Sequence, residues 1–157
     1  MATPDQLREV LRRVPTGVAV LTVESRGQRI GLTVATLLSL SLEPPLVGVA
    51  IARHAAIHEL LRVAGDCAFS LLAADQADVA DHFARGVPPI GMWHGIETRV
   101  GTLGEPLLEG AVGWLECRVL DELATGTHTF FVCEVVHTDL GRDGEPLIRL
   151  DGAYRTD

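Results

Sequence analysis

Residues 30–52 read IGLTVATLLSLSLEPPLVGVAIA, and this stretch decides the fold class. Its first part, residues 30–42, mixes Thr, Val and Ser in a pattern typical of an extended chain. Pro44 and Pro45 then interrupt it, because proline lacks the backbone N–H that a strand ladder needs. Residues 46–52 are a continuous apolar run, which predicts a strand buried on both faces. The stretch therefore predicts two extended segments separated by a sharp turn.

Further strands cluster on both sides of this stretch. Apolar and β-branched runs predict strands at residues 18–23, 67–72, 111–120, 129–140 and 147–150. Helical spacing of apolar residues predicts helices over residues 4–13 and 57–64 and around residues 75–83. Residues 86–110, which hold six Gly and three Pro, are expected to form a mostly irregular surface loop. Because the strands do not alternate with helices, we expect a mainly β fold, an antiparallel β-barrel with peripheral α-helices.

The composition indicates one acidic domain. All 157 residues, 1–157, are expected to form it. Aromatic residues make up 4% of the chain, so its core must be aliphatic. All 13 basic residues are Arg against 21 acidic residues, which gives a net charge of −8. This balance argues against nucleic-acid binding, and the absence of Lys excludes a Schiff-base lysine.

Neither a membrane nor an export signal is indicated. The first residues carry charges at every turn, and no apolar run approaches the roughly 20 residues of a membrane span. Cys67, Cys117 and Cys133 are widely spaced and odd in number, which argues against a disulfide framework. We therefore expect a cytoplasmic protein whose cysteines are small buried hydrophobic residues.

Hydroxyl groups mark the first candidate site. Thr33, Thr36, Ser39 and Ser41 lie in the extended stretch just before the two prolines. Hydroxyls and backbone N–H groups can bind a phosphate or a heterocycle without any formal charge. The alternative is a barrel strand whose polar residues face solvent, and composition alone favours that alternative.

Arg53 and His54 form the second candidate site because they directly follow the apolar run 46–52. Functional groups often lie where a buried strand ends, and Arg can hold a phosphate through two parallel hydrogen bonds. An ordinary solvated strand end is equally compatible with this pair. His54 and His58 are four residues apart, but without a third ligand at useful spacing no metal site is expected.

Gly126-Thr127-His128 is the third candidate, directly before the predicted strand 129–140. A lone His after a Gly turn carries little weight by itself. The chain has no Gly-x-Ser-x-Gly nucleophile elbow and no Gly-x-Gly-x-x-Gly dinucleotide fingerprint. A nicotinamide cofactor, if one is used, is therefore not held in the Rossmann manner.

Together these segments resemble the flavin reductase-like family, short-chain reductases built on an FMN-binding split barrel. The matching motifs are Pro15-Thr16-Gly17-Val18, Gly31-Leu32-Thr33-Val34, Ser39-Leu40-Ser41-Leu42-Glu43-Pro44-Pro45, Phe83-Ala84, Gly104-Glu105-Pro106-Leu107-Leu108, Gly126-Thr127-His128 and Gly152-Ala153-Tyr154. Each motif is weak alone. Their joint order from residue 15 to residue 154 carries the resemblance.

The resemblance implies an FMN-binding split β-barrel that forms a homodimer, with flavin near the subunit interface. It implies an NAD(P)H:flavin oxidoreductase that transfers hydride from NADH or NADPH to FMN or FAD. In many members the reduced flavin leaves and supplies a partner monooxygenase. A non-catalytic flavin-binding or partner-binding module on the same fold is the alternative.

The resemblance also implies roles for individual residues. The flavin ring and ribityl chain would lie along Thr33, Val34, Ala35 and Thr36. The ribityl-phosphate side would be served by Ser39, Ser41, Arg53 and His54. The border of the flavin or nicotinamide pocket would be formed by Phe83, Ala84 and Arg85. His128 would face the nicotinamide as the catalytic residue.

Three positions depart from the family pattern. Ala35 stands where Asn or Ser is common, so one flavin hydrogen bond is expected to be missing. Thr127 replaces the usual Asp, which changes the electrostatics around His128. Cys133 replaces a Gly, which is expected to narrow that wall of the pocket.

Overall fold

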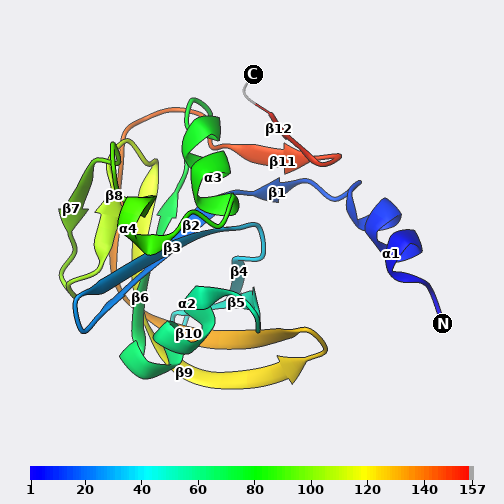
Figure 1. Cartoon of the computed structure of the whole chain (residues 1–157), viewed down its shortest axis with the longest axis horizontal. Coiled ribbons are helices and arrows are strands. Elements are labelled where there is room, and N and C mark those ends of the chain that lie inside the picture. Colours follow the sequence, from blue (N-terminus) through cyan, green and yellow to red (C-terminus); the bar gives the residue numbers. More distant parts are fainter. Residues whose placement is uncertain (156–157) are drawn as a thin grey trace.

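A curled antiparallel sheet forms the body of the molecule in the computed structural model, which describes residues 1–155 (Figure 1). Residues 156 and 157, which the predicted domain includes, lie outside the described range. In spatial order, the seven strands are β3 (Gln28–Val34), β2 (Ala19–Ser25), β6 (Asp66–Leu71), β9 (Gly113–Thr125), β10 (His128–Leu140), β5 (Leu46–Ala52) and β4 (Leu38–Ser41). Every neighbouring pair is antiparallel, and the predicted mainly β fold with a few helices is confirmed.

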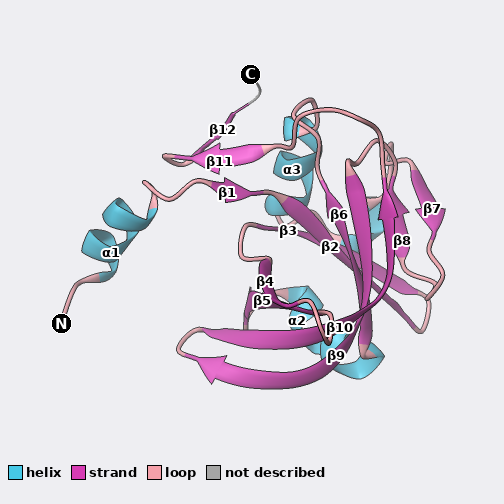
Figure 2. Cartoon of the chain, turned by 180° about the vertical axis from the view of Figure 1, so that it is seen from behind, coloured by secondary structure: helices cyan, strands magenta, loops and turns pink. Residues whose placement is uncertain are grey.

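The helices are α1 (Pro4–Leu11), α2 (Ala56–Ala64), α3 (Ala77–Ala84) and the short α4 (Pro89–Met92). Helices α2, α3 and α4 pack on the sheet, whereas α1 stands away from it (Figures 1 and 2). Both α2 and α3 pack on β2 and β3. α1 begins with a capping box between Thr3 and Gln6, and none of its residues is buried. α2 ends at Gly65, whose φ of 75° is the left-handed cap that glycine adopts without strain.

The core is aliphatic, as the composition predicts. Its fully buried members include Val20, Leu21, Val49 and Leu61, together with a few aromatic rings such as Phe131. Each such aliphatic side chain contributes about 1.5–3 kcal/mol through removal from water. All three cysteines are free and buried, as expected.

Residues 86–110, predicted to be mostly an irregular surface loop, are irregular over most of their length, but they also contain short elements, and one of these is not at the surface. It contains α4 and a hairpin of β7 (Thr98–Val100) and β8 (Pro106–Leu108). β8 is buried, and the backbone N–H of Leu108 donates to Ser70 Oγ at 3.0 Å. Strands of three residues are too short to show a periodic pattern, which explains why the sequence did not indicate them.

Residues 30–52 also differ from the expected structure. A bend at residues 35–37 divides the predicted extended segment into β3 and β4. β5 has the predicted bounds, but Leu46, Val47, Ala50 and Ala52 are only half-buried, so burial on both faces is wrong. β5 is the last strand but one, and only four residues of β4 flank it on the open side.

A small separate sheet joins the two ends of the chain. Its strands are β1 (Thr16–Gly17), β11 (Ile148–Leu150) and β12 (Ala153–Arg155), with β11 in the middle. Thr16 lies opposite Arg149 in this sheet. Within residues 1–155 no helix combines the length and apolar character needed to cross a membrane.

Candidate functional site

Two of the three predicted candidates meet at one end of β5. The register of β10 against β5 sets His128 opposite Ala52, directly beside Arg53. The backbone N–H of Arg53 donates to the carbonyl of Thr127 at 3.0 Å, which ties the two turns together. Arg53, His54 and His128 are all exposed. Arg53 forms no ion pair within the described part of the chain, so its charge is available to a ligand.

The bend after β3 brings Thr36 to the same strand. Its Oγ1 donates to the carbonyl of Ala50 at 3.1 Å and accepts from the Ala50 N–H at 3.2 Å. Thr33 donates to the carbonyl of Ala80 at 2.6 Å, and Val34 is buried. Both threonine hydroxyls therefore serve the protein's own backbone. They hold the bend in place, and Thr33 keeps its acceptor capacity.

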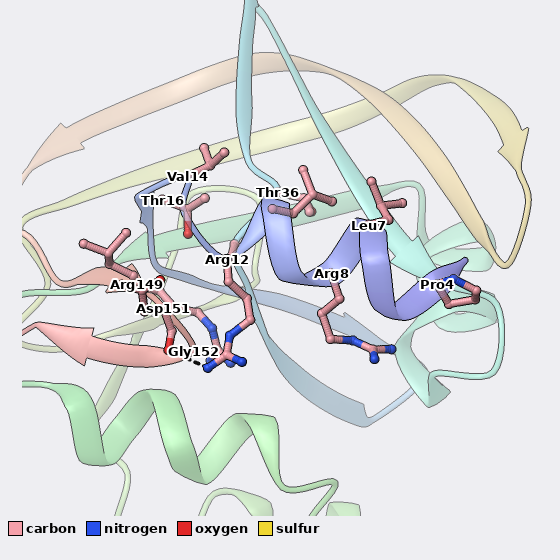
Figure 3. Close-up of a pocket in the computed structure, with 13 residues that line it drawn as sticks. Pro4, Leu7, Arg8, Arg12, Val14, Thr16, Thr36, Arg149, Asp151 and Gly152 are labelled. Atoms are coloured by element: carbon pink, nitrogen blue, oxygen red, sulfur yellow. Dashed lines mark hydrogen bonds between the residues drawn. The ribbon is translucent and has the colours of Figure 1, made fainter. Parts of the chain in front are cut away.

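A hollow of about 880 Å³ opens beside this bend (Figure 3). Ala35 and Thr36 form one wall, Leu7 and Leu11 of α1 form another, and the turn between β11 and β12 closes it. Ligand pockets in proteins typically measure about 300–1,000 Å³ and are mostly apolar. The α1 wall was not among the predicted site residues. The apolar stripe of the predicted helix 4–13 was the signal for it, because such a stripe indicates a face that packs against another surface.

Reciprocal hydrogen bonds fix the α1 wall. Asp151 N donates to the carbonyl of Arg12 at 2.8 Å, and Arg12 Nη2 donates back to the carbonyl of Asp151 at 2.9 Å. Figure 3 shows Arg12 turned toward Asp151 and Gly152, whereas Leu7 and Val14 lie toward Thr36. Gly152 has a φ of 76°, and a Cβ there would come within 2.9 Å of Arg12 Nη2. The turn between β11 and β12 therefore requires glycine at position 152 in order to hold the C-terminal end of α1.

Ser39 and Ser41 lie in a different place from Arg53. They face β5 at Val47 and Leu46, respectively. Arg53 lies six positions after Val47, which corresponds to about 20 Å along a strand at roughly 3.3 Å per residue. One phosphate group cannot contact both ends within one chain. The structure thus divides the predicted phosphate-side residues between two locations.

The end of α3 holds Phe83, Ala84 and Arg85. Phe83 was expected to border the pocket, but it is only 2% exposed. Its ring centroid lies 5.3 Å from that of Trp93, and its edge would meet any Cβ at Gly31. Phe83 is therefore a core residue that supports β3 from behind. Ala84 and Arg85 are exposed.

His128 has a specific partner in the residue that departs from the family motif. Its Nδ1 lies 2.9 Å from Thr127 Oγ1, and its carbonyl accepts from Thr125 Oγ1 at 3.2 Å. Thr127 thus keeps a hydrogen-bond contact to the imidazole while it brings no charge. The ring can be oriented without an adjacent carboxylate.

Cys133 does not narrow the pocket wall, and that expectation is wrong. It is fully buried and lies opposite Val47 and Val119 in the sheet. Contact with the thiols of Cys117 and Cys133, together with burial, raises the pKa of Cys67 well above its usual value. A buried thiol with a raised pKa, as in Cys67, is an inert packing group.

Comparison with known proteins identifies relatives along the whole chain. The family model described as "Flavin reductase like domain" matches residues 11–156. The reductase component of 4-hydroxyphenylacetate 3-monooxygenase from Thermus thermophilus is 34% identical over 151 residues, which cover 96% of this chain and 95% of the relative. An NADH-dependent FAD reductase from Streptomyces globisporus is 36% identical over 154 residues, with 96% and 84% covered.

A solved structure agrees with these sequence matches. An NADH:FAD oxidoreductase from Streptomyces globisporus, in complex with NAD and FAD fragments, superposes with a TM-score of 0.91 at 33% identity. The match covers 99% of this chain and 94% of that chain. Sequence and overall shape thus agree, and the chain belongs to the flavin reductase-like domain family.

Proposed function

We propose that this protein is an NAD(P)H-dependent flavin reductase that uses NADH or NADPH to reduce FMN or FAD. The observation that carries the proposal is the register between β5 and β10. It joins Arg53, a cation without an ion pair among residues 1–155, to an oriented imidazole, His128. Flavin, when bound, supplies the hydride-accepting chemistry. Relatives named as NADH-dependent FAD and FMN reductases support the assignment.

In this proposal each residue acts by binding or orientation. Arg53 and His54 hold the phosphate, Thr36 fixes the bend against which the ring system lies, and His128 orients the nicotinamide. Hydride transfer depends on alignment of two stacked rings, so such positioning supplies much of the rate. Of the residues predicted along the flavin, Ala35 and Thr36 line the hollow, which gives a bound flavin room.

The test follows absorbance of NADH and of NADPH with FMN and with FAD. Wild type is expected to consume one or both nucleotides only when flavin is present. Arg53→Ala should raise the flavin Kd about tenfold or more, since a hydrogen bond to a charged group contributes about 1.5–3 kcal/mol. Arg26→Ala, which removes an equal charge from an exposed turn, is the matched control.

His128→Ala separates the proposed catalytic role from flavin binding. It should lower kcat/KM for the nucleotide while flavin affinity changes little. Unchanged turnover and unchanged KM would remove the role of His128. Tight flavin binding without consumption of either nucleotide would instead identify a non-catalytic flavin-binding or partner-binding module.

We also propose a homodimer. Leu38, Leu40 and Leu42 are exposed on or just after the edge strand β4. Contiguous apolar side chains on an edge strand are typical of an interface between chains. We further propose a monooxygenase as a partner. The relative from Thermus thermophilus is the reductase component of a monooxygenase, so reduced flavin would pass from this protein to such an enzyme.

The remaining proposals concern organisation and location. The seven-stranded sheet, its helices and the small terminal sheet support a single domain over residues 1–157. The three free cysteines are compatible with a reducing compartment, and we propose a cytoplasmic location.

A further inference from the structure

A buried imidazole lies directly behind His128 and has no part in the chemistry described so far. His58, on α2, is 4% exposed, and its Nε2 lies 2.8 Å from Thr129 Oγ1. Thr129 follows His128 in β10 and is 6% exposed. The other ring nitrogen, Nδ1, lies 2.9 Å from Glu59 Oε1. Both nitrogens therefore have partners, and loss of either partner would leave a buried polar group unpaired.

The hydrogen-bond directions in this group follow from its chemistry. An ionised carboxylate only accepts, so Glu59 requires the proton of a neutral His58 to lie on Nδ1. Nε2 is then the acceptor, and the Thr129 hydroxyl donates to it. The Thr129 hydroxyl is thereby fixed in one orientation within the strand that carries His128.

Helix α2 also contacts β9, the other strand of the hairpin. Arg62 donates to Glu59 at 3.2 Å and makes two hydrogen bonds to the Glu122 carboxylate, at 3.1 and 2.7 Å. We call His58, Glu59 and Arg62 the α2 clamp. It joins α2 to β10 through Thr129 and to β9 through Glu122. The turn between those two strands contains Thr127, and His128 is the first residue of β10.

The clamp lies at the exposed end of the hairpin. All residues from 120 to 128 are exposed, and the hairpin extends beyond the rest of the sheet (Figures 1 and 2). β10 pairs with β5 on one side and with β9 on the other, but the β9 residues opposite His128 and Thr129 are themselves exposed. α2 begins at Ala56, three residues after Arg53, so one helix supports both the Arg53 turn and the His128 turn.

We propose that His58 is a positioning residue for flavin reduction: through Thr129 it fixes the location of His128 relative to the Arg53 turn. The proposal rests on the proposed function. Reacting groups must come within about 3–3.5 Å, and a displacement of about 1 Å far from the chemistry can cost about 100-fold in rate. A buried hydrogen bond to the neighbouring residue is a direct means of preventing such a displacement.

The first experiment compares His58→Leu, Thr129→Val and His58→Gln. The Leu and Val variants fill similar volumes but remove the His58–Thr129 hydrogen bond, and each should lower kcat/KM for the nucleotide about tenfold. Flavin Kd should change less than about twofold, because the bond from the Ala55 N–H to the Ala52 carbonyl still closes the turn that carries Arg53. His58→Gln can still hydrogen-bond to Thr129 and should recover much of the loss. His137→Gln, an exposed His on the same strand, should behave as wild type.

A double variant separates positioning from general stability. If His58 acts through His128, His58→Leu should cost little once His128 is already Ala, since residues that act as a unit are non-additive. Full additivity of the two losses would overturn the proposal. So would loss of activity that follows only the loss of thermal stability, with no rescue by Gln.

Amide hydrogen exchange supplies a readout that does not depend on activity. His58→Leu should speed exchange at residues 126–129, and His137→Gln should not. Unchanged exchange in His58→Leu overturns the proposal. If wild type consumes no nucleotide, the proposed function fails, and exchange still decides whether His58 holds the turn.

Discussion

At the scale of single residues, Glu105 shows how the fold places a carboxyl group where its charge is costly. It is 3% exposed, and its Oε2 accepts from the backbone N–H of Glu24. Burial, together with the nearby carboxylates of Asp66, Glu24 and Glu116, raises the pKa of Glu105 to about 7 against the opposing effect of that hydrogen bond. Glu105 therefore titrates near neutral pH in the folded protein.

This pKa predicts a pH dependence of stability. Between about pH 4.5 and 7 the folded chain binds more protons at Glu105 than the unfolded chain, so stability falls as pH rises through that window, by up to about 3 kcal/mol. Glu105→Gln should match wild type near pH 5 and exceed it near pH 8. Urea unfolding at both pH values measures the difference. The exposed Glu109→Gln is the control, and equal pH slopes in wild type and Glu105→Gln would refute the prediction.

Individual site residues also show what could not be read from the sequence. Arg53, His54 and His128 were singled out correctly as neighbours of strand ends, but only the β5–β10 register reveals that they meet. Phe83 fits the family motif, yet which face of α3 turns inward depends on how the helix packs against β3. A motif fixes residue identity, whereas burial depends on packing between distant elements.

At the scale of elements, the long patterned segments were predictable and the short ones were not. β5 has its predicted bounds, and α2 ends at the predicted glycine. The β7–β8 hairpin was missed because its strands are held by packing against the sheet: Thr22 Oγ1 donates to the carbonyl of Pro106 at 2.7 Å. Local propensity does not report such contacts.

The anchoring of α1 leads to a prediction about this element. Gly152→Ala should strain the left-handed backbone and also push against Arg12, which should release α1. Gly27→Ala places the same residue at a φ of 80° with no atom within 4 Å, so it carries only the backbone cost of about 1 kcal/mol. Protease cleavage and hydrogen exchange within residues 4–11 should increase in Gly152→Ala alone. Equal effects in both variants would contradict the anchoring role.

At the scale of the whole molecule, charge and apolar surface have separate locations. The net charge of −8 does not prevent an anion site, because Arg53 lies at a strand end and forms no ion pair with any of residues 1–155. It should slow the approach of anionic flavin and nucleotide, and added salt should reduce that effect. The exposed leucines of β4 lie on the edge of the sheet, where a second copy can cover them.

The proposed homodimer can be tested at this scale. Leu42, which is 90% exposed, and Leu38 should lie in the interface, so the double variant Leu38→Glu/Leu42→Glu should shift the chain from twice its 16.8 kDa mass to that mass. Buried carboxylates without partners make association unfavourable. Ile90→Glu, at the fully exposed Ile90, is the control. Sedimentation velocity measures the mass, and a wild type that sediments as a monomer would contradict the proposal.

The small terminal sheet has a consequence for synthesis of the protein. Thr16 pairs with Arg149, and α1 is held at Asp151, so the α1 wall of the hollow depends on residues that are made after every strand of the main sheet. On the ribosome, strands β2 to β10 can pair before α1 has anything to dock against. A nascent chain should therefore form its sheet first and its ligand hollow later. Binding competence in this fold follows completion of the sheet.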